Sequence, residues 1–497
     1  MAGARKSAKY IFFGNFFSKG ITFIGSIFLA RILFPEDYGY LLIAMIVTGF
    51  AQMLSSMGFE NFYLQEKIKD EKHEAEILNI TFKLRVFVNL LMFLVQYFCS
   101  YPISNYYDEP IVGELLRIFS FSYIFTAFVQ TNLYILRKKV DFRPEVLANI
   151  LRDIAGTTVK VFLAWSGFGA LSFAYGGLLG TFLWTITILY FQRFLPDMKY
   201  WNKAIFLKVF YFGKHSLIAG IAGYLSTYID KILLTNTFPI SQVGGYSFAF
   251  GQSDNIKARL TRPMGSLVVS YIAKYKGNNK KIIETLASIT YFELVVMIPI
   301  YIFFLIYAES IVYYIFGEKW VFTVSVMQVF LIYGLLSTIA GSAINLLTGL
   351  GYPQILSNLS IKNLLVLFIS LSFIVFISDN IVLYASVFSI INFLYILFKA
   401  NAGLSKIDIS FGSFLRKIYI KEITIYLIIV LFFALSINFF IRNDIIAMPV
   451  TIITMFIIFL ILQGIVFEKI FTNSLSVIVG SNHKVYNFFR RLSQWSK

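Results

Sequence analysis

The chain has 497 residues, of which 58% are hydrophobic and only 14% are charged, and its mean hydropathy is +0.74. Soluble domains are about 45–50% apolar and about 25% charged, so this composition excludes an assembly of soluble domains. The 10 prolines, 31 glycines and one cysteine, Cys99, exclude a disordered, collagen-like or disulfide-rich chain. The class that remains is an integral membrane protein.

The formal net charge of +17 arises from 43 Lys and Arg against 26 Asp and Glu. A basic chain can bind nucleic acid, but the cytoplasmic loops of membrane proteins also collect Lys and Arg. We therefore assign most of the excess to loops and expect no nucleic-acid partner. Cations that lie inside the membrane spans are the ones that bear on function.

Apolar runs of about 20 residues recur along the chain, and each is long enough for a helix to cross a bilayer core of about 30 Å. They predict an all-α integral membrane protein with about fourteen transmembrane helices. In chain order, the expected spans are 10–33, 38–64, 77–101, 112–136, 145–165, 170–191, 209–234, 244–271, 282–307, 321–347, 354–377, 381–400, 418–440 and 446–467.

The loops between these spans predict the orientation of the chain. Loops on one side are rich in basic residues, as at 137–139, whereas the loops on the other side hold Arg31, Lys319 and Arg442. Because basic loops stay in the cytoplasm, we expect a multi-pass protein with both termini on that side. Every loop is short, which leaves no soluble domain for an active site, so we do not expect an enzyme.

Two sets of similar positions, about 200–210 residues apart, indicate an internal repeat. Pro144 and Pro353 open similar segments at spans five and eleven, and Gly39 and Gly245 precede a tyrosine at spans two and eight. Chance similarity between apolar helices is the alternative for matches this short. The repeat predicts two six-helix lobes, related by a pseudo-two-fold axis along the membrane normal, plus two C-terminal helices. The expected domains are 1–200, 201–410 and 411–497, the last ending in a cytoplasmic tail.

Several cations fall inside the expected spans. An ionisable side chain near the bilayer centre costs at least about 2.5–3.5 kcal/mol, so it normally faces a cavity or a partner. Span eight is the richest case, with a polar stretch from Gln252 to Pro263. Cations at depth outnumber acids, and a cavity that they line would attract an anion such as phosphate. The expected substrate-binding residues are Lys19, Arg152, Lys214, Lys257, Arg259, Arg262 and Lys362.

The same cations have alternative roles. They could form neutral pairs, as Arg152 with its neighbour Asp153, or extend to the membrane interface, as we expect for Lys83, Arg85 and Lys421. Three carboxylates are the best candidates for exchanging a coupling ion, either a proton or Na⁺. They are Asp254, Glu293 and Glu60.

Motifs for other chemistries are missing from the sequence. No G-x-x-x-x-G-K-[ST] run is present to bind ATP phosphates, so transport would need another source of energy. The three histidines, His73, His215 and His483, are too dispersed for a zinc site. We therefore expect no cofactor beyond a coupling ion, H⁺ or Na⁺, and no resident metal.

The segment IFLARILFPEDYGY at 27–40, followed by QMLSSMGF at 52–59, resembles the start of the Wzx-type polysaccharide and O-antigen flippases. These proteins form part of the multidrug/oligosaccharidyl-lipid/polysaccharide (MOP) exporter superfamily. The likeness extends to YIDKILL at 228–234 and IFGEKW at 315–320. It covers most of the first twelve expected spans, but the dense charge of span eight is not part of the family motif.

The resemblance implies a flippase that moves an undecaprenyl-pyrophosphate-linked oligosaccharide across the bacterial inner membrane, for O-antigen or another polysaccharide. It also implies alternating access between two lobes, driven by an ion gradient. Expected partners are the lipid-linked oligosaccharide, membrane lipids and polysaccharide polymerase machinery. The alternatives are another MOP exporter, for drugs or for a peptidoglycan lipid, and a polysaccharide polymerase or ligase. A polymerase would need a large external loop with catalytic Arg or His, and the expected external loops are short.

Overall fold

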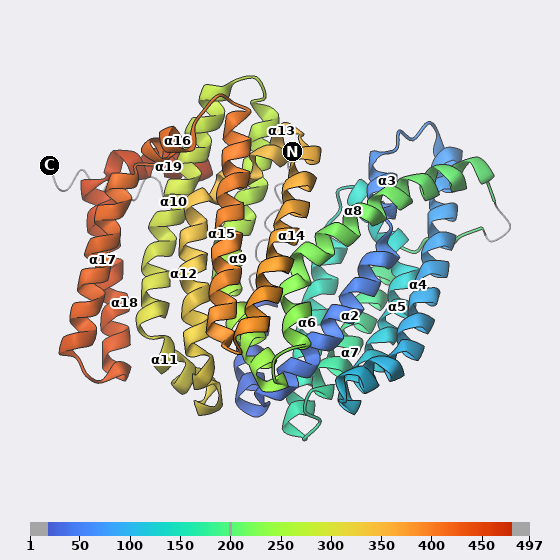
Figure 1. The fold of residues 1–497 in the computed structure, drawn as a ribbon. Coiled ribbons are helices and arrows are strands. Elements are labelled where there is room, and N and C mark those ends of the chain that lie inside the picture. The colour runs from blue at the N-terminus through green and yellow to red at the C-terminus, as the bar shows by residue number, and fades with distance from the viewer. Residues whose placement is uncertain (1–17, 198–200, 480–497) are drawn as a thin grey trace. The chain divides into compact units, whose positions relative to one another are not determined.

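The computed structural model describes residues 18–197 and 201–479, and every regular element within these ranges is helical (Figure 1). Eleven of the described helices are long and apolar enough to cross a membrane. The expectation of an all-α protein with many spans is therefore confirmed. The chain separates into two compact units, unit 1 (Met1–Gly245) and unit 2 (Tyr246–Lys497).

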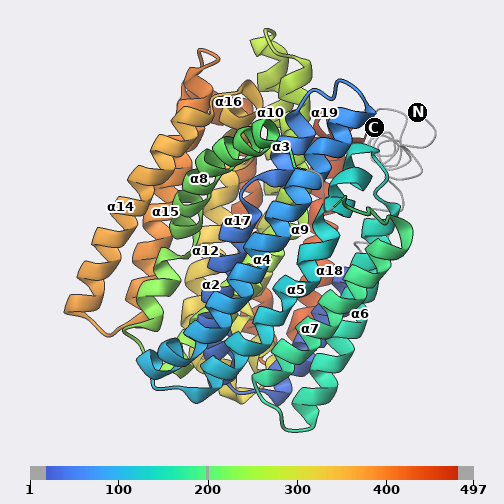
Figure 2. The same cartoon turned by 90° about the vertical axis from the view of Figure 1, so that its right-hand side faces the viewer.

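Unit 1 is a bundle of long helices. Proline in the first turn opens several of them, where its missing N–H costs nothing and its fixed φ suits the helix. The helices α4, α5, α7 and α6 pack side by side in that order, and α2 packs against α5 and α8 (Figure 2). The elements are a helix at 18–32, α2 (Pro35–Ser56), α3 (Phe59–Gln65), α4 (Glu71–Tyr107), α5 (Pro110–Lys138), α6 (Arg143–Trp165), α7 (Leu171–Phe191), α8 (Lys203–Thr235) and the start of α9 (Ile240–Lys274).

Small residues allow close approach between helices of unit 1. A Cβ added to Gly176 would lie 2.7 Å from the Gly156 carbonyl oxygen, so α6 and α7 touch through their backbones. The starts of α2 and α9 meet in the same way. A Cβ added to Gly39 would lie 2.4 Å from the Ile240 carbonyl oxygen, and one on Gly244 would lie 1.8 Å from that of Pro35.

Unit 2 contains helices that are interrupted more often. Its core forms where α10 packs against α12, α17 and α19, while α15 packs against α12 and α14. Figure 1 shows α17 and α18 running side by side as a pair. After α9, the elements are α10 (Asn279–Ile306), α11 (Ala308–Ile311), η1 (Val312–Phe316), η2 (Glu318–Thr323), α12 (Val324–Ala340), η3 (Gly341–Asn345), α13 (Leu346–Leu350), α14 (Pro353–Ile377), α15 (Ile381–Ser405), α16 (Phe411–Lys417), α17 (Ile420–Phe440), α18 (Asp444–Ile461), η4 (Leu462–Val466) and α19 (Glu468–Val479).

Each of the fourteen expected spans overlaps a helix of the structure. Eleven described helices meet the length and hydropathy required of a span, and the other three expected spans fall on the helix 18–32, on α6 and on α9. The last two carry charges in their middle turns. Pro144 and Pro353 lie in the first turns of α6 and α14. The fourteen-span count, the pseudo-two-fold lobes and the three domain ranges stay predictions.

Candidate functional site

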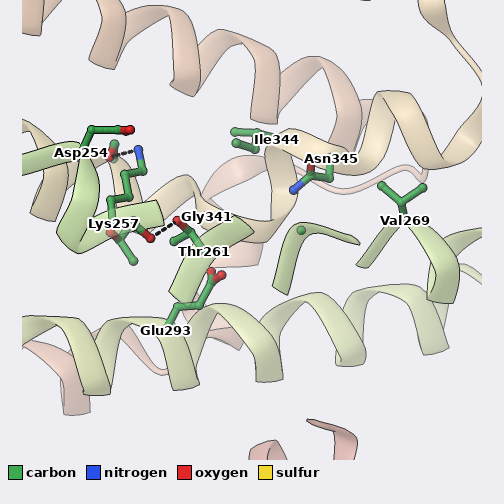
Figure 3. Close-up of a pocket in the computed structure, with 11 residues that line it drawn as sticks. Asp254, Lys257, Thr261, Val269, Glu293, Gly341, Ile344 and Asn345 are labelled. Carbon is green, nitrogen blue, oxygen red and sulfur yellow. Dashed lines mark hydrogen bonds between the residues drawn. The ribbon is translucent and has the colours of Figure 1, made fainter. Parts of the chain in front are cut away.

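Unit 2 holds a cavity of about 420 Å³, which we name the unit 2 cavity (Figure 3). Three segments form its wall: α9, α10 and the end of α12 with η3. Its lining mixes charged, hydroxyl and amide side chains with a few apolar ones. The lining residues are Asp254, Lys257, Thr261, Gly265, Val269, Glu293, Ser337, Thr338, Gly341, Ile344 and Asn345.

Lys257 is the cation among the described residues that line this cavity. Its ammonium nitrogen Nζ donates a hydrogen bond to Ser337 Oγ at 2.5 Å and lies 5.5 Å from the centre of the Tyr333 ring. Asp254 lies one helical turn earlier on α9, so both side chains project from the same side of that helix. The carboxyl groups of Asp254 and Glu293 line the same cavity, so Lys257 faces groups that can carry the opposite charge. One cation is thus balanced against two acids.

Glu293 lies on α10 and is only 2% exposed. The Ser342 hydroxyl donates a long hydrogen bond of 3.4 Å to its carboxylate oxygen Oε2. Gly341 leaves room for this carboxylate, because an added Cβ would lie 2.7 Å from Oε2. Figure 3 shows the Glu293 side chain reaching from α10 toward the segment that contains Gly341. A buried carboxylate in a membrane helix is costly unless a partner or ion accompanies it.

The helix opposite Glu293 is broken. The α-helix α12 ends at Ala340, a 3₁₀ turn runs over Gly341–Asn345, and α13 resumes at Leu346. Irregular backbone at membrane depth is tolerated where it is buried or lines a cavity, and such broken helices often form ion or substrate sites. We expected one continuous span over 321–347, and the Gly341-Ser342 pair was the available signal for a break.

Unit 1 holds a second cavity of about 610 Å³, which we name the unit 1 cavity. Helices α2 and α4 to α8 all contribute to its wall. Hydroxyl and amide side chains dominate the lining, together with two arginines and three aromatic rings. The lining residues are Met45, Thr48, Gly49, Gln52, Ser55, Arg85, Phe119, Ser122, Thr126, Gln130, Arg152, Gly177, Leu178, Thr181, Trp184 and Tyr228.

Arg85, on α4, lies in a different environment from the one that its sequence position predicts. We expected it to reach the membrane interface, but it is 7% exposed and lines the unit 1 cavity. Its Nη1 donates to the carbonyl oxygens of Ser55 at 3.1 Å and Ser56 at 3.4 Å, at the C-terminal end of α2. A cation is favoured there by the helix dipole. Among the described residues, its Nε has no hydrogen-bond partner.

Arg152, on α6, lines the same cavity and is partly neutralised. Its Nε donates to Asp153 Oδ1 at 3.1 Å, and the Ser18 hydroxyl also hydrogen-bonds to the Asp153 carboxylate. The Arg152 side chain is 41% exposed, whereas that of Asp153 is 13% exposed. The pairing that we gave as an alternative therefore exists, and it does not remove Arg152 from the cavity wall.

The remaining candidates from the sequence are dispersed. Among the described side chains, Lys19, Lys214 and Lys362 are exposed and line neither cavity. Glu60 pairs with Arg137 at 2.5 Å, away from both cavities. The roles predicted for these residues stay predictions, as do those of two arginines of α9 whose side chains lie outside the described residues, Arg259 and Arg262.

Comparison with known proteins gives consistent matches. Residues 28–325 match the family described as "Polysaccharide biosynthesis protein". The chain is 21% identical over 322 residues to the "Lipopolysaccharide biosynthesis protein WzxC" of Escherichia coli (strain K12), covering 64% of each chain. It is 23% identical over 341 residues to the "Succinoglycan biosynthesis transport protein ExoT" of Rhizobium meliloti (strain 1021), covering 68% of this chain and 67% of the relative. The chain thus spans about two thirds of the length of these relatives.

Among solved structures, the "Lipid II flippase MurJ, inward closed conformation" matches with a TM-score of 0.74. The match covers 92% of this chain and 99% of that chain at 15% sequence identity. At this identity the likeness concerns the fold.

Proposed function

We propose that this chain, which belongs to the polysaccharide biosynthesis protein family, is a flippase that moves a lipid-linked glycan across a membrane. The resemblance to Wzx-type polysaccharide flippases is confirmed by the family match and by the WzxC relative. On this proposal, the chain is a membrane transport protein and not an enzyme. More specifically, we propose that the cargo is an undecaprenyl-pyrophosphate-linked oligosaccharide. The chain would carry it across the bacterial inner membrane for the synthesis of lipopolysaccharide or a similar polymer.

One observation carries the proposal: charged groups that would be costly in lipid are gathered around a polar cavity in each unit. Lys257, Asp254 and Glu293 share the unit 2 cavity, and Arg85 and Arg152 share the unit 1 cavity. A cargo with a charged headgroup and polar sugars needs such sites to enter the membrane core.

We assign ion coupling to the unit 2 cavity. Asp254 and Glu293 exchange a proton or Na⁺, and Lys257 supplies the opposite charge when the ion has left. Neutralising one carboxylate weakens its electrostatic attraction to Lys257. The neighbouring 3₁₀ segment η3 is not held by regular α-helical hydrogen bonds, so a change of helix geometry requires less free energy there. The ion can shift the balance between two states only by as much as its affinities for them differ.

The exposed cations have a separate proposed role. Lys19, Lys214 and Lys362 each lie on an exposed helix surface, and each would contact an anionic group of the cargo as a point charge. Two arginines of α9 would assist them, Arg259 and Arg262. With both termini in the cytoplasm, the cargo would be collected from the inner leaflet and delivered to polymerase machinery on the outer side.

Deleting the gene from the native bacterium tests the proposal. We expect lipid-linked repeat units to accumulate on the cytoplasmic face, and a plasmid copy of the gene to restore surface polysaccharide. Single repeat units on the outer face would indicate a polymerase instead, because a polymerase acts after translocation. Unchanged delivery of units to the outer face would contradict the proposal.

A further inference from the structure

One end of unit 2 carries a cluster of basic side chains, which we name the unit 2 basic face. It consists of the basic residues of two segments, 274–281 and 406–417. The first segment contains four lysines and no acid, and the second contains Lys406, Arg416 and Lys417 together with Asp408. All seven basic side chains are exposed. The neighbouring acid on α10 is Glu284, which is also exposed.

The two segments form one continuous surface. The Asn279 side-chain amide donates to the Ile407 carbonyl oxygen at 3.4 Å, which joins the α9–α10 turn to the α15–α16 turn. Phe414 is fully buried and fixes α16 against the core of unit 2. Figure 1 shows α13 and α16 at the end of unit 2 where α9 and α10 are connected. The cations of both segments therefore share one end of the unit.

The charges of the unit 2 basic face are not compensated within the chain. Among the described residues, none of its seven cations lies within 4 Å of a carboxylate oxygen. Like charges that are gathered in this way repel one another, and bound anions relieve the repulsion. The face is thus suited to a partner that carries several negative charges.

Unit 1 provides a contrast at its own exposed loop, residues 66–74. That loop contains three lysines but also four acids. Lys208 of α8 pairs there with Glu66 at 2.6 Å, and Arg137 pairs with Glu60 and Glu145 nearby. A cytoplasmic location accounts for basic residues in both units, but it does not require acids to be absent. The uncompensated charge is therefore a particular property of unit 2.

The unit 2 basic face lies at the level expected for lipid headgroups. It follows the last residue of α9, includes the first residues of α10, and lies between α15 and α17, and both of these helices are long and apolar enough to span a membrane. Two tyrosines at this end, Tyr352 and Tyr419, are 40% and 43% exposed. Tyrosine is enriched where a membrane helix meets the headgroup layer.

Tyrosine rings also hold some of the lysines in place. Lys406 Nζ lies 5.3 Å from the centre of the Tyr352 ring, and Lys281 Nζ lies 4.4 Å from that of Tyr275. Such contacts attract the ammonium group without using it as an ion-pair partner. An ammonium has three N–H donors, so donors remain for a phosphate oxygen.

Exposed apolar side chains continue from the face along the spanning helices. On α17, Ile425 is 50% exposed and Ile428 is 59% exposed, about one to two turns inside the helix. On α15, Phe398 is 64% exposed, about two turns before Lys406. A positive end that continues into apolar helix sides matches a phosphate headgroup with acyl chains. A soluble acidic protein or a nucleic acid would match the charge alone.

We propose that the unit 2 basic face binds anionic phospholipids of the surrounding leaflet. The headgroup phosphates contact the exposed cations of both segments, and the acyl chains lie along α15 and α17. In the predicted orientation this is the cytoplasmic leaflet. These lipids are bound neighbours of the protein and not its cargo, so the inference goes beyond the proposed function.

The test is native mass spectrometry of the purified full-length chain, released from micelles of a neutral detergent. The probes are dioleoyl phosphatidylglycerol, which is anionic, and dioleoyl phosphatidylcholine, which has no net charge. We expect the Kd for the anionic lipid to be lower by about tenfold or more, because each nearby cation adds to the attraction. Removing four cations should abolish most of this preference and leave phosphatidylcholine binding unchanged. The combined variant is Lys280→Gln, Lys281→Gln, Arg416→Gln and Lys417→Gln.

Two further variants separate charge from general effects. The control neutralises three exposed lysines of the unit 1 loop, where acids already compensate them, and should retain the preference for the anionic lipid. Its substitutions are Lys67→Gln, Lys69→Gln and Lys72→Gln. A rescue variant, Lys280→Arg with Lys281→Arg, keeps both charges and should also retain the preference. Thermal unfolding of each variant confirms that it is folded.

Several outcomes would overturn the inference. These are equal binding of the two lipids, an unchanged preference in the four-residue variant, and an equal loss in the unit 1 control. Inorganic phosphate is added as a competitor, and displacement of phosphatidylglycerol at an equal concentration of phosphate would assign the face to a soluble anion instead. The assay involves no transport, so its failure leaves the gene-deletion test of the proposed function unaffected.

Discussion

The two cavities differ in the kind of charge that they contain. Among the described residues, the unit 1 cavity is lined by two guanidinium groups and no acidic residue, whereas the unit 2 cavity is lined by one ammonium group and two carboxyl groups. Guanidinium groups stay charged at any physiological pH and bind oxyanions in fixed geometry. Carboxylates can take up and release a proton or Na⁺. On the function proposed above, this difference would place the cargo site and the coupling-ion site in separate units.

The cavities also differ in how their charges are compensated. Arg85 is stabilised by partial charges, those of the carbonyl groups at the end of α2. Lys257 shares its cavity with two acidic side chains, Asp254 and Glu293. The unit 1 cavity therefore keeps a positive potential that an anion can satisfy. The net charge of the groups that line the unit 2 cavity changes by one unit when one carboxylate is neutralised.

The largest expected effect is on ion coupling. Glu293→Gln removes an exchangeable carboxylate from the unit 2 cavity, so transport driven by an ion gradient should fall by about 5–150-fold, the usual range of a coupling energy. Proteoliposomes that contain lipid-linked oligosaccharide and an imposed pH or Na⁺ gradient measure this rate.

Glu60→Gln tests the competing candidate, because Glu60 is also a predicted ion-exchange carboxylate but pairs with Arg137 and lines neither cavity. It should retain coupling and lose at most about 1 kcal/mol of stability, as expected of a partly exposed ion pair. Loss of coupling in Glu60→Gln together with normal coupling in Glu293→Gln would reverse the assignment of the ion site.

A smaller effect is expected from the backbone beside Glu293. Gly341→Ala places a methyl group where the Glu293 carboxylate lies, so it should destabilise the protein by about 1–3 kcal/mol and also reduce ion-driven transport. Gly251→Ala is the control, since no atom lies within 4 Å of its added Cβ and alanine favours a helix. Thermal unfolding and the proteoliposome rate are measured for both. Equal stability of the two variants would contradict the close packing at Gly341.

The smallest expected effect concerns anion binding by the two arginines of the unit 1 cavity, Arg85 and Arg152. The probe is glucuronate, a soluble acidic sugar, and a titration of the purified full-length chain in lipid nanodiscs gives its Kd. Arg152→Gln should weaken glucuronate binding only about two- to fivefold, because Asp153 already partly neutralises Arg152. The loss in Arg85→Gln should be clearly greater. A larger loss in Arg152→Gln would move the anion site toward α6.

Most of the helices could be predicted from the sequence, because twenty apolar residues in a row have few alternatives to a membrane helix. Lys257, Asp254 and Glu293 could be found in the same way, as charges within apolar runs. Their meeting around one cavity depends on the packing of α9 against other segments, which no local pattern specifies.

The burial of Arg85 was not predicted, because a long charged side chain near the start of an expected span normally extends to the membrane interface. Its burial depends on the end of α2, 29 residues away in the sequence. Lys19, Lys214 and Lys362 show the converse, since their depth in the expected spans suggested burial but their side chains are exposed. Which face of a helix meets a cavity is decided by neighbouring helices.

The central claim is that the unit 1 cavity holds the acidic cargo and the unit 2 cavity holds the coupling ion. The most direct measurement is a glucuronate titration of the full-length wild type, Arg85→Gln and Glu293→Gln without an ion gradient. The account predicts that the Kd rises in Arg85→Gln by about tenfold more than it does in Glu293→Gln. An equal or greater rise in Glu293→Gln would contradict it.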